Sequence, residues 1–247
     1  MPSHSTVPDI TSHVSRFREA LEAVATPERA VNEKAYLKSD LTFLGARVPE
    51  IRGLATAYRR EHPKLDPVFL LDLTAELWAS EVHELRSLAI ALLAKYARSL
   101  PQEAFAHTYS LLCAADTWAH VDWMCTEVFA VLLARFPSTL ENLDGWSEHE
   151  NFWVRRGSML VLLPSLKKEA VHWQRFCSYA ATMLEEREFF IRKAIGWILR
   201  ETSKRDPAGV TAFLEQHIDK LSGLTFREGS RKLAPAEIER LKGLRSK

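Results

Sequence analysis

This sequence of 247 residues contains little cysteine and little glycine, and its net charge is close to zero. The three cysteines, Cys113, Cys125 and Cys177, are odd in number and set in apolar helical pattern, which indicates reduced core thiols in a cytosolic protein. Glycine occurs only nine times, and no stretch alternates β-branched with polar residues, so we expect no sheet. The 33 basic and 32 acidic residues leave a charge of +1, so a nucleic-acid surface would require local segregation of basic residues.

Signals for membranes, metals and nucleotides are missing as well. The N-terminus lacks a basic region followed by an apolar run, and the longest apolar runs, 88–94 and 128–134, are too short to cross a bilayer. No Gly-rich phosphate loop, metal-binding His or Cys pair, or nucleophile elbow is present. We therefore expect a cytoplasmic monomer that uses no metal and no nucleotide cofactor.

Helical periodicity runs through the whole chain, and prolines divide it at regular intervals. The prolines at expected first helical positions are Pro27, Pro49, Pro67, Pro101, Pro137, Pro207 and Pro235. The expected helices are 10–25, 27–39, 49–61, 67–79, 81–98, 101–114, 118–136, 137–145, 150–163, 169–185, 188–204, 207–220, 225–233 and 235–243. The fold class predicted from this pattern is all-α.

Pairs of these helices recur about every 35 to 45 residues without a strict sequence repeat, which is typical of an α-solenoid of degenerate helical hairpins. The second members, 81–98, 118–136, 150–163 and 188–204, would line one concave wall. No linker or change of composition divides the chain, so we predict a single domain over 1–247, with 1–8 and 244–247 frayed.

The helix expected over 188–204 has two different faces. Its apolar stripe consists of Ile191, Ala194, Ile195 and Ile198. The opposite face consists of Phe189, Lys193, Gly196, Trp197, Arg200 and Lys204. Two cations, an indole and a glycine that permits close approach would suit a DNA backbone. The alternative is a solvated face with one exposed indole.

A second informative stretch opens the helix over 118–136. With Thr117 as N-cap, Trp118 falls in the first turn and Asp122 lies one turn later on the same face. Asp122 could pair with an arginine of a neighbouring repeat, or it could stabilise a cationic centre beside an aromatic wall. Arg156, in a mostly apolar helix, could neutralise Asp122 or grip a phosphate. The histidines, His83 and His120 among them, are expected to be exposed or half-buried.

These stretches together resemble the AlkD-type DNA alkylation repair family, which are DNA glycosylases built from HEAT-like repeats. The motifs are Tyr36 with Phe43-Leu44-Gly45, Trp118-x-x-x-Asp122, Phe152-Trp-x-x-Arg156 and the long motif 188–201. The resemblance covers about residues 15–233. It implies a right-handed superhelix of HEAT-like hairpins with a concave DNA-binding face.

The resemblance also implies excision of N3- or N7-alkylated purines from duplex DNA, without a cofactor. Asp122 would be the catalytic carboxylate, Trp118 and Trp197 the aromatic walls, and Arg156 a phosphate contact near the lesion. The remaining expected DNA contacts are Tyr36, Phe189, Phe190, Lys193, Arg200, Lys204 and Arg227. The chain departs from the pattern at Thr117, where a relative carries a second Trp, and at Leu163-Pro164-Ser165, where Lys167 and Lys168 could replace a basic residue.

This chemistry suits the residues. An alkylated purine is already cationic and leaves without a strong general acid, while a carboxylate opposes the positive charge that develops on the sugar. A shallow wall has no deep pocket for an extruded base, so the lesion is expected to stay largely in the duplex. The rival hypothesis is a non-catalytic HEAT-like scaffold that binds nucleic acid or protein. Asp122 separates the two, because a pure binder gains nothing from a carboxylate that repels phosphates.

Overall fold

A computed structural model of the chain describes residues 9–169 and 171–245. The described residues form helices and no strand, with one isolated β-bridge between Thr42 and Val82. The all-α class is therefore confirmed. The chain separates into two compact units, Met1–Arg135 and Phe136–Lys247, which are described one at a time. The single domain over 1–247 stays a prediction.

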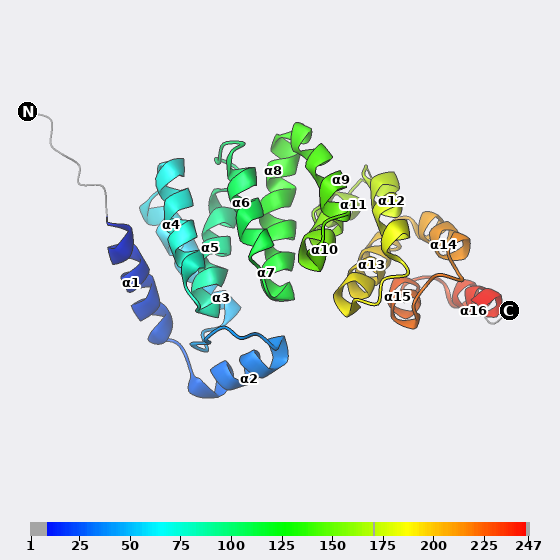
Figure 1. Cartoon of the computed structure of the whole chain (residues 1–247), viewed down its shortest axis with the longest axis horizontal. Coiled ribbons are helices and arrows are strands. Elements are labelled where there is room, and N and C mark those ends of the chain that lie inside the picture. Colours follow the sequence, from blue (N-terminus) through cyan, green and yellow to red (C-terminus); the bar gives the residue numbers. More distant parts are fainter. Residues whose placement is uncertain (1–8, 170, 246–247) are drawn as a thin grey trace, which may run out of the picture. The chain divides into compact units, whose positions relative to one another are not determined.

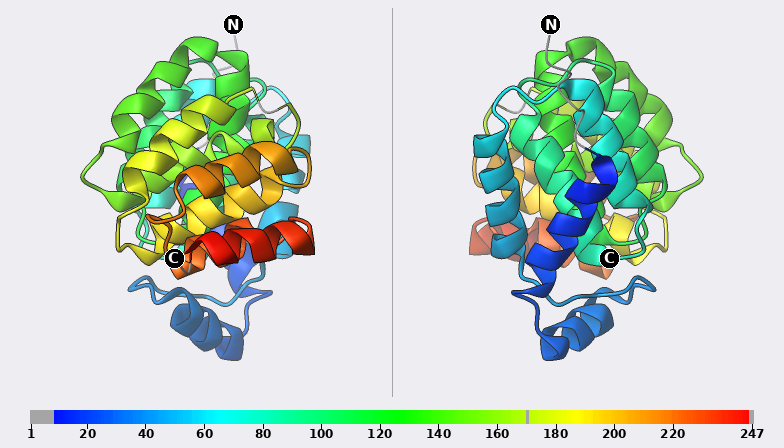
Figure 2. Two further views of the ribbon diagram at one scale, coloured as in Figure 1. Left: turned by 90° about the vertical axis from the view of Figure 1, so that its right-hand side faces the viewer. Right: turned by 90° about the vertical axis from the view of Figure 1, so that its left-hand side faces the viewer.

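The first unit is a set of packed helices with α5 at its centre. Its elements are α1 (Ile10–Glu22), α2 (Pro27–Leu37), α3 (Val48–Glu61), α4 (Pro67–Ala79), α5 (His83–Tyr96), α6 (Ala104–Cys113), α7 (Trp118–Trp123), the π-helix η1 (Met124–Phe129) and α8 (Ala130–Arg135). Helix α5 packs against α3 and α4, and α1 lies beside α4 (Figures 1 and 2). The side chains of Leu88, Ile90 and Leu92 are fully buried, so α5 is apolar almost all round.

Helix α2 differs from the other helices of this unit, because none of its residues is buried. In Figure 1 it lies across the lower ends of the upright helices of the unit. It begins at Pro27 after Thr26 and ends at Lys38, which adopts a left-handed conformation with φ of 50°. A helix that buries so little must be held by specific contacts at a few points.

The second unit contains η2 (Pro137–Glu141, a 3₁₀ helix), α9 (Asn142–Ser147), α10 (Phe152–Leu160), α11 (Leu163–Leu166), α12 (Trp173–Met183), α13 (Phe189–Thr202), α14 (Pro207–Gln216), α15 (Gly223–Gly229) and α16 (Pro235–Arg245). Helix α13 packs between α10 and α15. Helix α14 lies beside α16 at the C-terminal end of the unit (Figure 2, left).

Most expected helix boundaries hold to within a few residues. Six of the seven prolines stand at helix starts; the exception is Pro101, since α6 begins only at Ala104. Pro164 does not simply end a helix, because it opens the short α11. The expected fraying is wrong for Leu244 and Arg245, which belong to α16, while 1–8 and 246–247 lie outside the described residues. No helix in the described part of the chain combines the length and apolarity needed to cross a bilayer.

Candidate nucleic-acid interface

The start of α7 has the local geometry that its sequence predicts. Thr117 is the N-cap, and its Oγ1 accepts a hydrogen bond of 3.4 Å from the Ala119 amide. Trp118 and Asp122 follow on one face, and both are half-buried. The indole and the carboxylate are thus held next to each other by one rigid turn of helix.

Tyr36 contributes to the same place from α2. Its ring lies 5.8 Å from that of Trp118, centroid to centroid, at an interplanar angle of 88°. The Tyr36 side chain is otherwise open, with 72% of its surface exposed. Sequence reasoning associated these two residues only through the family resemblance, and the fold brings them together.

The helix that carries Asp122 is not one continuous α-helix, contrary to the expectation for 118–136. The α-helical turn ends at Trp123, a π-helix follows over Met124–Phe129, and α-helix resumes at Ala130. The Thr126 hydroxyl donates a hydrogen bond of 2.7 Å to the carbonyl of Asp122. Single π-helical turns are rare and occur often at functional sites.

A buried carboxylate positions the loop that supports α2. Glu84, on α5, is fully buried and accepts hydrogen bonds of 3.0 Å from the Leu44 amide and 2.6 Å from the Gly45 amide. Gly45 has φ of 97°, and a Cβ there would overlap the carbonyl oxygen of Thr26. The carbonyl of Gly45 in turn accepts a hydrogen bond of 3.3 Å from the Thr26 amide, just before α2 begins. The motif Phe43-Leu44-Gly45 therefore connects the start of α2 to α5 through backbone hydrogen bonds.

Two histidines are buried beneath this loop, so the expectation that they are exposed or half-buried is wrong. His83 stacks on Phe43 and on His120, with centroids 4.5 Å apart in both pairs. His120 Nε2 lies 3.1 Å from the Ser87 hydroxyl. Burial lowers the pKa of His83 to about 4 and holds that of His120 well below its usual value. Both rings are therefore neutral at pH 7.

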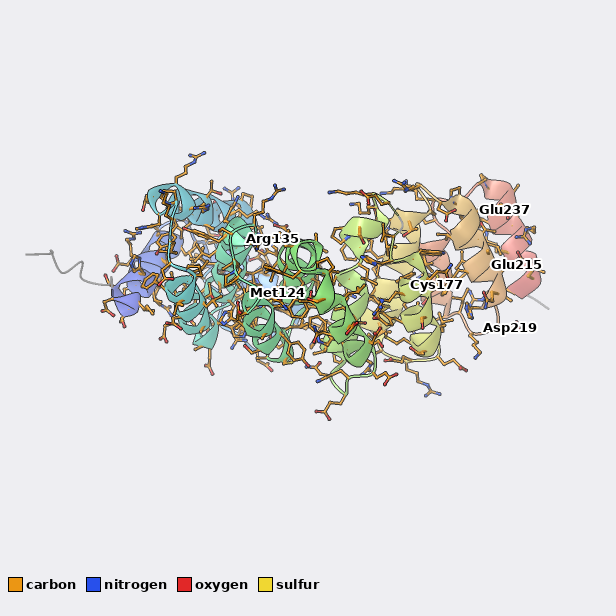
Figure 3. All side chains as sticks on the ribbon, turned by 90° about the horizontal axis from the view of Figure 1, so that it is seen from above. Met124, Arg135, Cys177, Glu215, Asp219 and Glu237 are labelled. Carbon is orange, nitrogen blue, oxygen red and sulfur yellow. The ribbon has the colours of Figure 1, made fainter. Side chains whose placement is uncertain are left out.

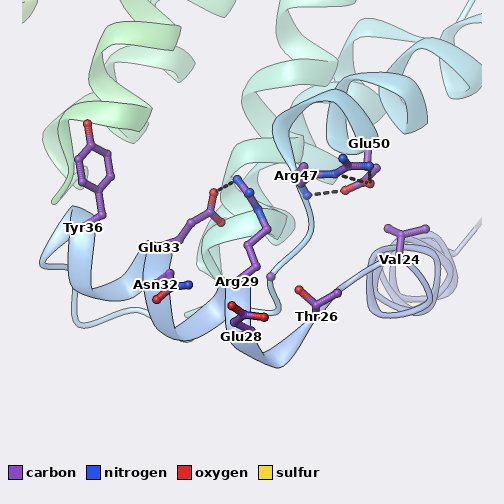
Figure 4. Close-up of a pocket in the computed structure, with 10 residues that line it drawn as sticks. Val24, Thr26, Glu28, Arg29, Asn32, Glu33, Tyr36, Arg47 and Glu50 are labelled. Carbon is purple, nitrogen blue, oxygen red and sulfur yellow. Dashed lines mark hydrogen bonds and ion pairs between the residues drawn. The ribbon is translucent and has the colours of Figure 1, made fainter.

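A pocket of about 700 Å³ opens beside Tyr36 (Figure 4). No sequence motif predicts this pocket. Its walls come from α2, from the turn before it and from the start of α3. Four of its charged groups form ion pairs, Arg29 with Glu33 and Arg47 with Glu50. The described residues contain no group of three or more His, Cys, Asp or Glu side chains placed to hold a metal ion.

In the second unit, α13 buries the stripe that periodicity predicts. Ile191, Ala194, Ile195 and Ile198 have no exposed surface. On the opposite face Phe189 is 54% exposed and Trp197 is half-buried, while Lys204, which follows the end of the helix, is exposed. Helix α15 contributes Arg227, which is also exposed.

The expectation that Gly196 lets a DNA backbone approach α13 is wrong. Helix α15 occupies that space, because a Cβ on Gly196 would lie 2.6 Å from the Cβ of Glu228 and 3.2 Å from the carbonyl oxygen of Thr225. Gly196 is accordingly buried. Its lack of a side chain serves helix–helix packing.

Lys193 and Arg200 are not the open cations that the sequence suggested. Both pair with Glu228, whose Oε1 lies 2.8 Å from Lys193 Nζ and whose Oε2 accepts from Arg200. The hydrogen bond from Lys193 holds the pKa of Glu228 below its usual value, against the effect of burial. Lys193 keeps 40% of its side chain exposed, whereas Arg200 keeps 20%.

A second carboxylate organises the other end of the same face. Glu201 lies 2.6 Å from Lys204 and 3.8 Å from Lys167, and its own side chain is only 12% exposed. Lys167, which the sequence offered as a replacement phosphate contact, is thus paired within the unit. Glu228 and Glu201 therefore pair with Lys193, Arg200, Lys204 and Lys167.

Arg156 is almost completely buried, with 3% of its surface exposed. Its guanidinium donates a hydrogen bond to the carbonyl of Phe190 at the start of α13. Phe190 also stacks near Phe152 and Trp153, with centroid separations of 6.5 and 4.8 Å. The phosphate contact by Arg156 stays a prediction, as does the convergence of Trp118 and Asp122 with residues of the second unit.

Comparisons with known proteins are consistent across sequence and structure. Residues 17–233 match the family described as DNA alkylation repair enzyme. A solved chain described as a predicted DNA alkylation repair enzyme from Enterococcus faecalis is 27% identical, with a TM-score of 0.78 over 85% of this chain and 97% of that chain. AlkD2 from Streptococcus mutans is 16% identical, with a TM-score of 0.61 over 96% and 98% of the two chains. No curated protein matches this chain. The helical-repeat fold is thereby confirmed.

Proposed function

The chain belongs to the DNA alkylation repair enzyme family, and from this membership we propose that it is a monofunctional DNA glycosylase acting on N3- and N7-alkylated purines in duplex DNA. The observation that carries the proposal is the placement of the Asp122 carboxylate one helical turn after Trp118, whose indole meets the exposed ring of Tyr36. An aromatic wall beside a carboxylate suits a reacting centre that becomes positively charged.

The proposed reaction is hydrolysis of the N-glycosidic bond. The C1′–N bond breaks, and its electron pair neutralises the cationic base. The oxygen of a water molecule bonds to C1′, and the proton that this water loses passes to solvent. Asp122 orients that water and opposes the charge on the sugar, an effect of several kcal/mol in a partly dry site. Trp118 adds roughly 0.5 to 2 kcal/mol through the attraction of its ring face for a cation. These interactions strengthen as charge develops, which is the requirement for catalysis.

The proposal assigns the second unit to binding. Trp197 would form a second aromatic wall, and Arg156 would hold a phosphate. Lys193, Arg200 and Lys204 would supply charge along α13, together with Arg227, while Phe189 and Phe190 shape the groove. We further propose that the lesion stays largely in the duplex and is recognised by its charge. Efficient release of 7-methylguanine with no release of a bulky N7 adduct would contradict that part.

The decisive experiment measures release of 3-methyladenine and 7-methylguanine from duplex DNA, together with DNA affinity. Asp122→Asn should lower release by about 100-fold or more, in the range seen when a charge-stabilising group is removed. DNA affinity should be equal or higher, because a charge that repels phosphate is gone. Asp116→Asn is the matched control, since Asp116 is exposed just before the same helix and should leave both quantities unchanged. Wild-type protein that binds DNA but releases neither base would instead establish the non-catalytic scaffold.

A further inference from the structure

The helix that carries Asp122 buries residues with a period of four. The buried pairs are His120 with Val121, Met124 with Cys125, Val128 with Phe129, and Leu132 with Leu133. In a regular α-helix, a step of four residues rotates by about 40° beyond one turn, so from the first to the last pair the stripe would drift by about 120°. A straight α-helix therefore cannot bury all four pairs against one wall.

The π-helix η1 resolves this mismatch. With more residues per turn, η1 unwinds the helix and returns the later pairs to the buried side. Met124, which begins η1 and is labelled in Figure 3, is fully buried, and Phe129, at its end, packs edge-on against Phe105 of α6 at 5.0 Å. The same unwinding acts on the neighbouring face, where Trp118, Asp122 and Thr126 also recur every four residues and are all half-buried.

A π-helical turn needs support, because its hydrogen bonds alone do not favour it over α-helix. Here α5 and α6 pack against η1, and α3 adds a polar contact on its outer side. Arg52 makes a bidentate ion pair with Glu127, with Nη1 lying 2.9 Å from Oε2. The same guanidinium lies 4.3 Å from the ring centroid of Trp123, directly before η1. The buried Nε1 of Trp123 makes no hydrogen bond among the described residues, so packing and this guanidinium hold the ring.

We propose that Arg52 and Glu127 are positioning residues, which stabilise η1 and so fix the direction in which the turn of α7 presents Trp118 and Asp122 together. This inference rests on the proposed glycosylase function. Neither residue needs to touch DNA. Arg52 joins α3 to both sides of the junction, Trp123 before it and Glu127 within it. Loss of either partner would let η1 relax towards α-helix, which would rotate the turn that carries both Trp118 and Asp122 relative to the residues that follow η1.

The test compares single-turnover release of 7-methylguanine with DNA affinity in Glu127→Gln, Arg52→Ala and Arg52→Lys. Glu127→Gln and Arg52→Ala should lower the release rate by about tenfold or more, as expected for a displaced reacting group, while DNA affinity stays within about twofold. Arg52→Lys, which keeps the charge but loses the bidentate geometry, should fall between these variants and wild type. The charge-swapped double variant Arg52→Glu/Glu127→Arg should recover part of the lost rate, because it restores the ion pair but not the guanidinium over Trp123. The matched control Arg16→Ala breaks the exposed pair with Glu61 in the same unit and should change nothing.

The outcomes separate this inference from the proposed function. Wild-type protein that releases no base refutes the glycosylase proposal itself. An active wild type with Glu127→Gln and Arg52→Ala at full rate overturns the positioning role alone. So does a parallel loss of release rate, DNA affinity and thermal stability without recovery in the double variant, because that pattern reflects a structural role only. If Glu127→Gln fails to fold, Arg52→Lys provides the test: an intermediate release rate supports the positioning role, and an unchanged release rate contradicts it.

Discussion

The ring of Tyr36 meets the indole of Trp118 edge-on, with 5.8 Å between centroids and 88° between planes. The contact links α2, which buries none of its residues, to the helix that carries Asp122. An edge-to-face pair of this kind contributes about 0.5 to 1.5 kcal/mol beyond area burial. Because the rest of Tyr36 is exposed, that energy acts mainly on the orientation of Trp118 and of α2.

Replacing Tyr36 with alanine should therefore slow release of alkylated base by about 2- to 10-fold, the range that matches the energy of the pair. Tyr36→Phe keeps the ring and should retain most of the rate. Single-turnover assays measure both variants, and Val31→Ala, at another exposed position of α2, is the control. Equal rates for Tyr36→Ala and Val31→Ala would remove Tyr36 from the site.

Glu228→Gln should increase affinity for duplex DNA. Glu228 neutralises part of the charge of Lys193 and Arg200, and its carboxylate stays ionised because its pKa is lowered. Its removal makes both cations available to phosphates, so the slope of log affinity against log salt should steepen by up to about one. Titrations at several salt concentrations measure this change.

The matched control for that titration is Glu215→Gln. Glu215, labelled in Figure 3, pairs with Arg240 at 2.9 Å in the same unit, but the pair lies between α14 and α16 and is largely exposed. It should not alter DNA binding. Unchanged or weaker binding by Glu228→Gln at low salt would contradict the assignment of Lys193 and Arg200 to the DNA surface.

Stability should fall as the pH drops from about 6.5 to about 4. The pKa of His83 is about 4 in the folded protein against 6.5 in the unfolded chain, so within this interval the unfolded chain binds the proton more readily. The contribution is fully present above pH 6.5 and lost below pH 4, and it amounts to about 3 kcal/mol. Denaturant titrations across this range measure it.

The variant His83→Phe isolates this effect from that of other histidines. A phenyl ring can occupy the same place between Phe43 and His120 without binding a proton. Its unfolding free energy should fall less than that of wild type over the same interval. Identical pH profiles for the two proteins would assign the acid sensitivity to other groups.

Some positions are readable in the sequence because their cause is local. The stripe from Ile191 to Ile198 is buried as periodicity predicts, and Thr117 caps the helix that begins at Trp118. The period of four around Asp122 was also present in the chain. Over so short a segment, a period of four differs too little from 3.6 residues per turn to predict a π-helical turn.

Other positions could not be predicted because their partners are distant in sequence. Gly196 looked suited to a DNA backbone, yet α15 fills the space beside it. Lys193 and Arg200 looked solvated, yet Glu228 pairs with both. Helix periodicity identifies which residues point away from the core of their own repeat, but not whether a later helix covers them.

The amino-acid sequence by itself determined the helices, their starts and the membership of a repair family, since these depend on short-range spacing and on motifs within single helices. Only the tertiary structure decided which charges are neutralised, that Glu84 binds the amides of the loop that follows α2, and that a π-helical turn follows Asp122. Packing between helices far apart in the chain sets these features, because side chains that share no local pattern come into contact only once the chain has folded.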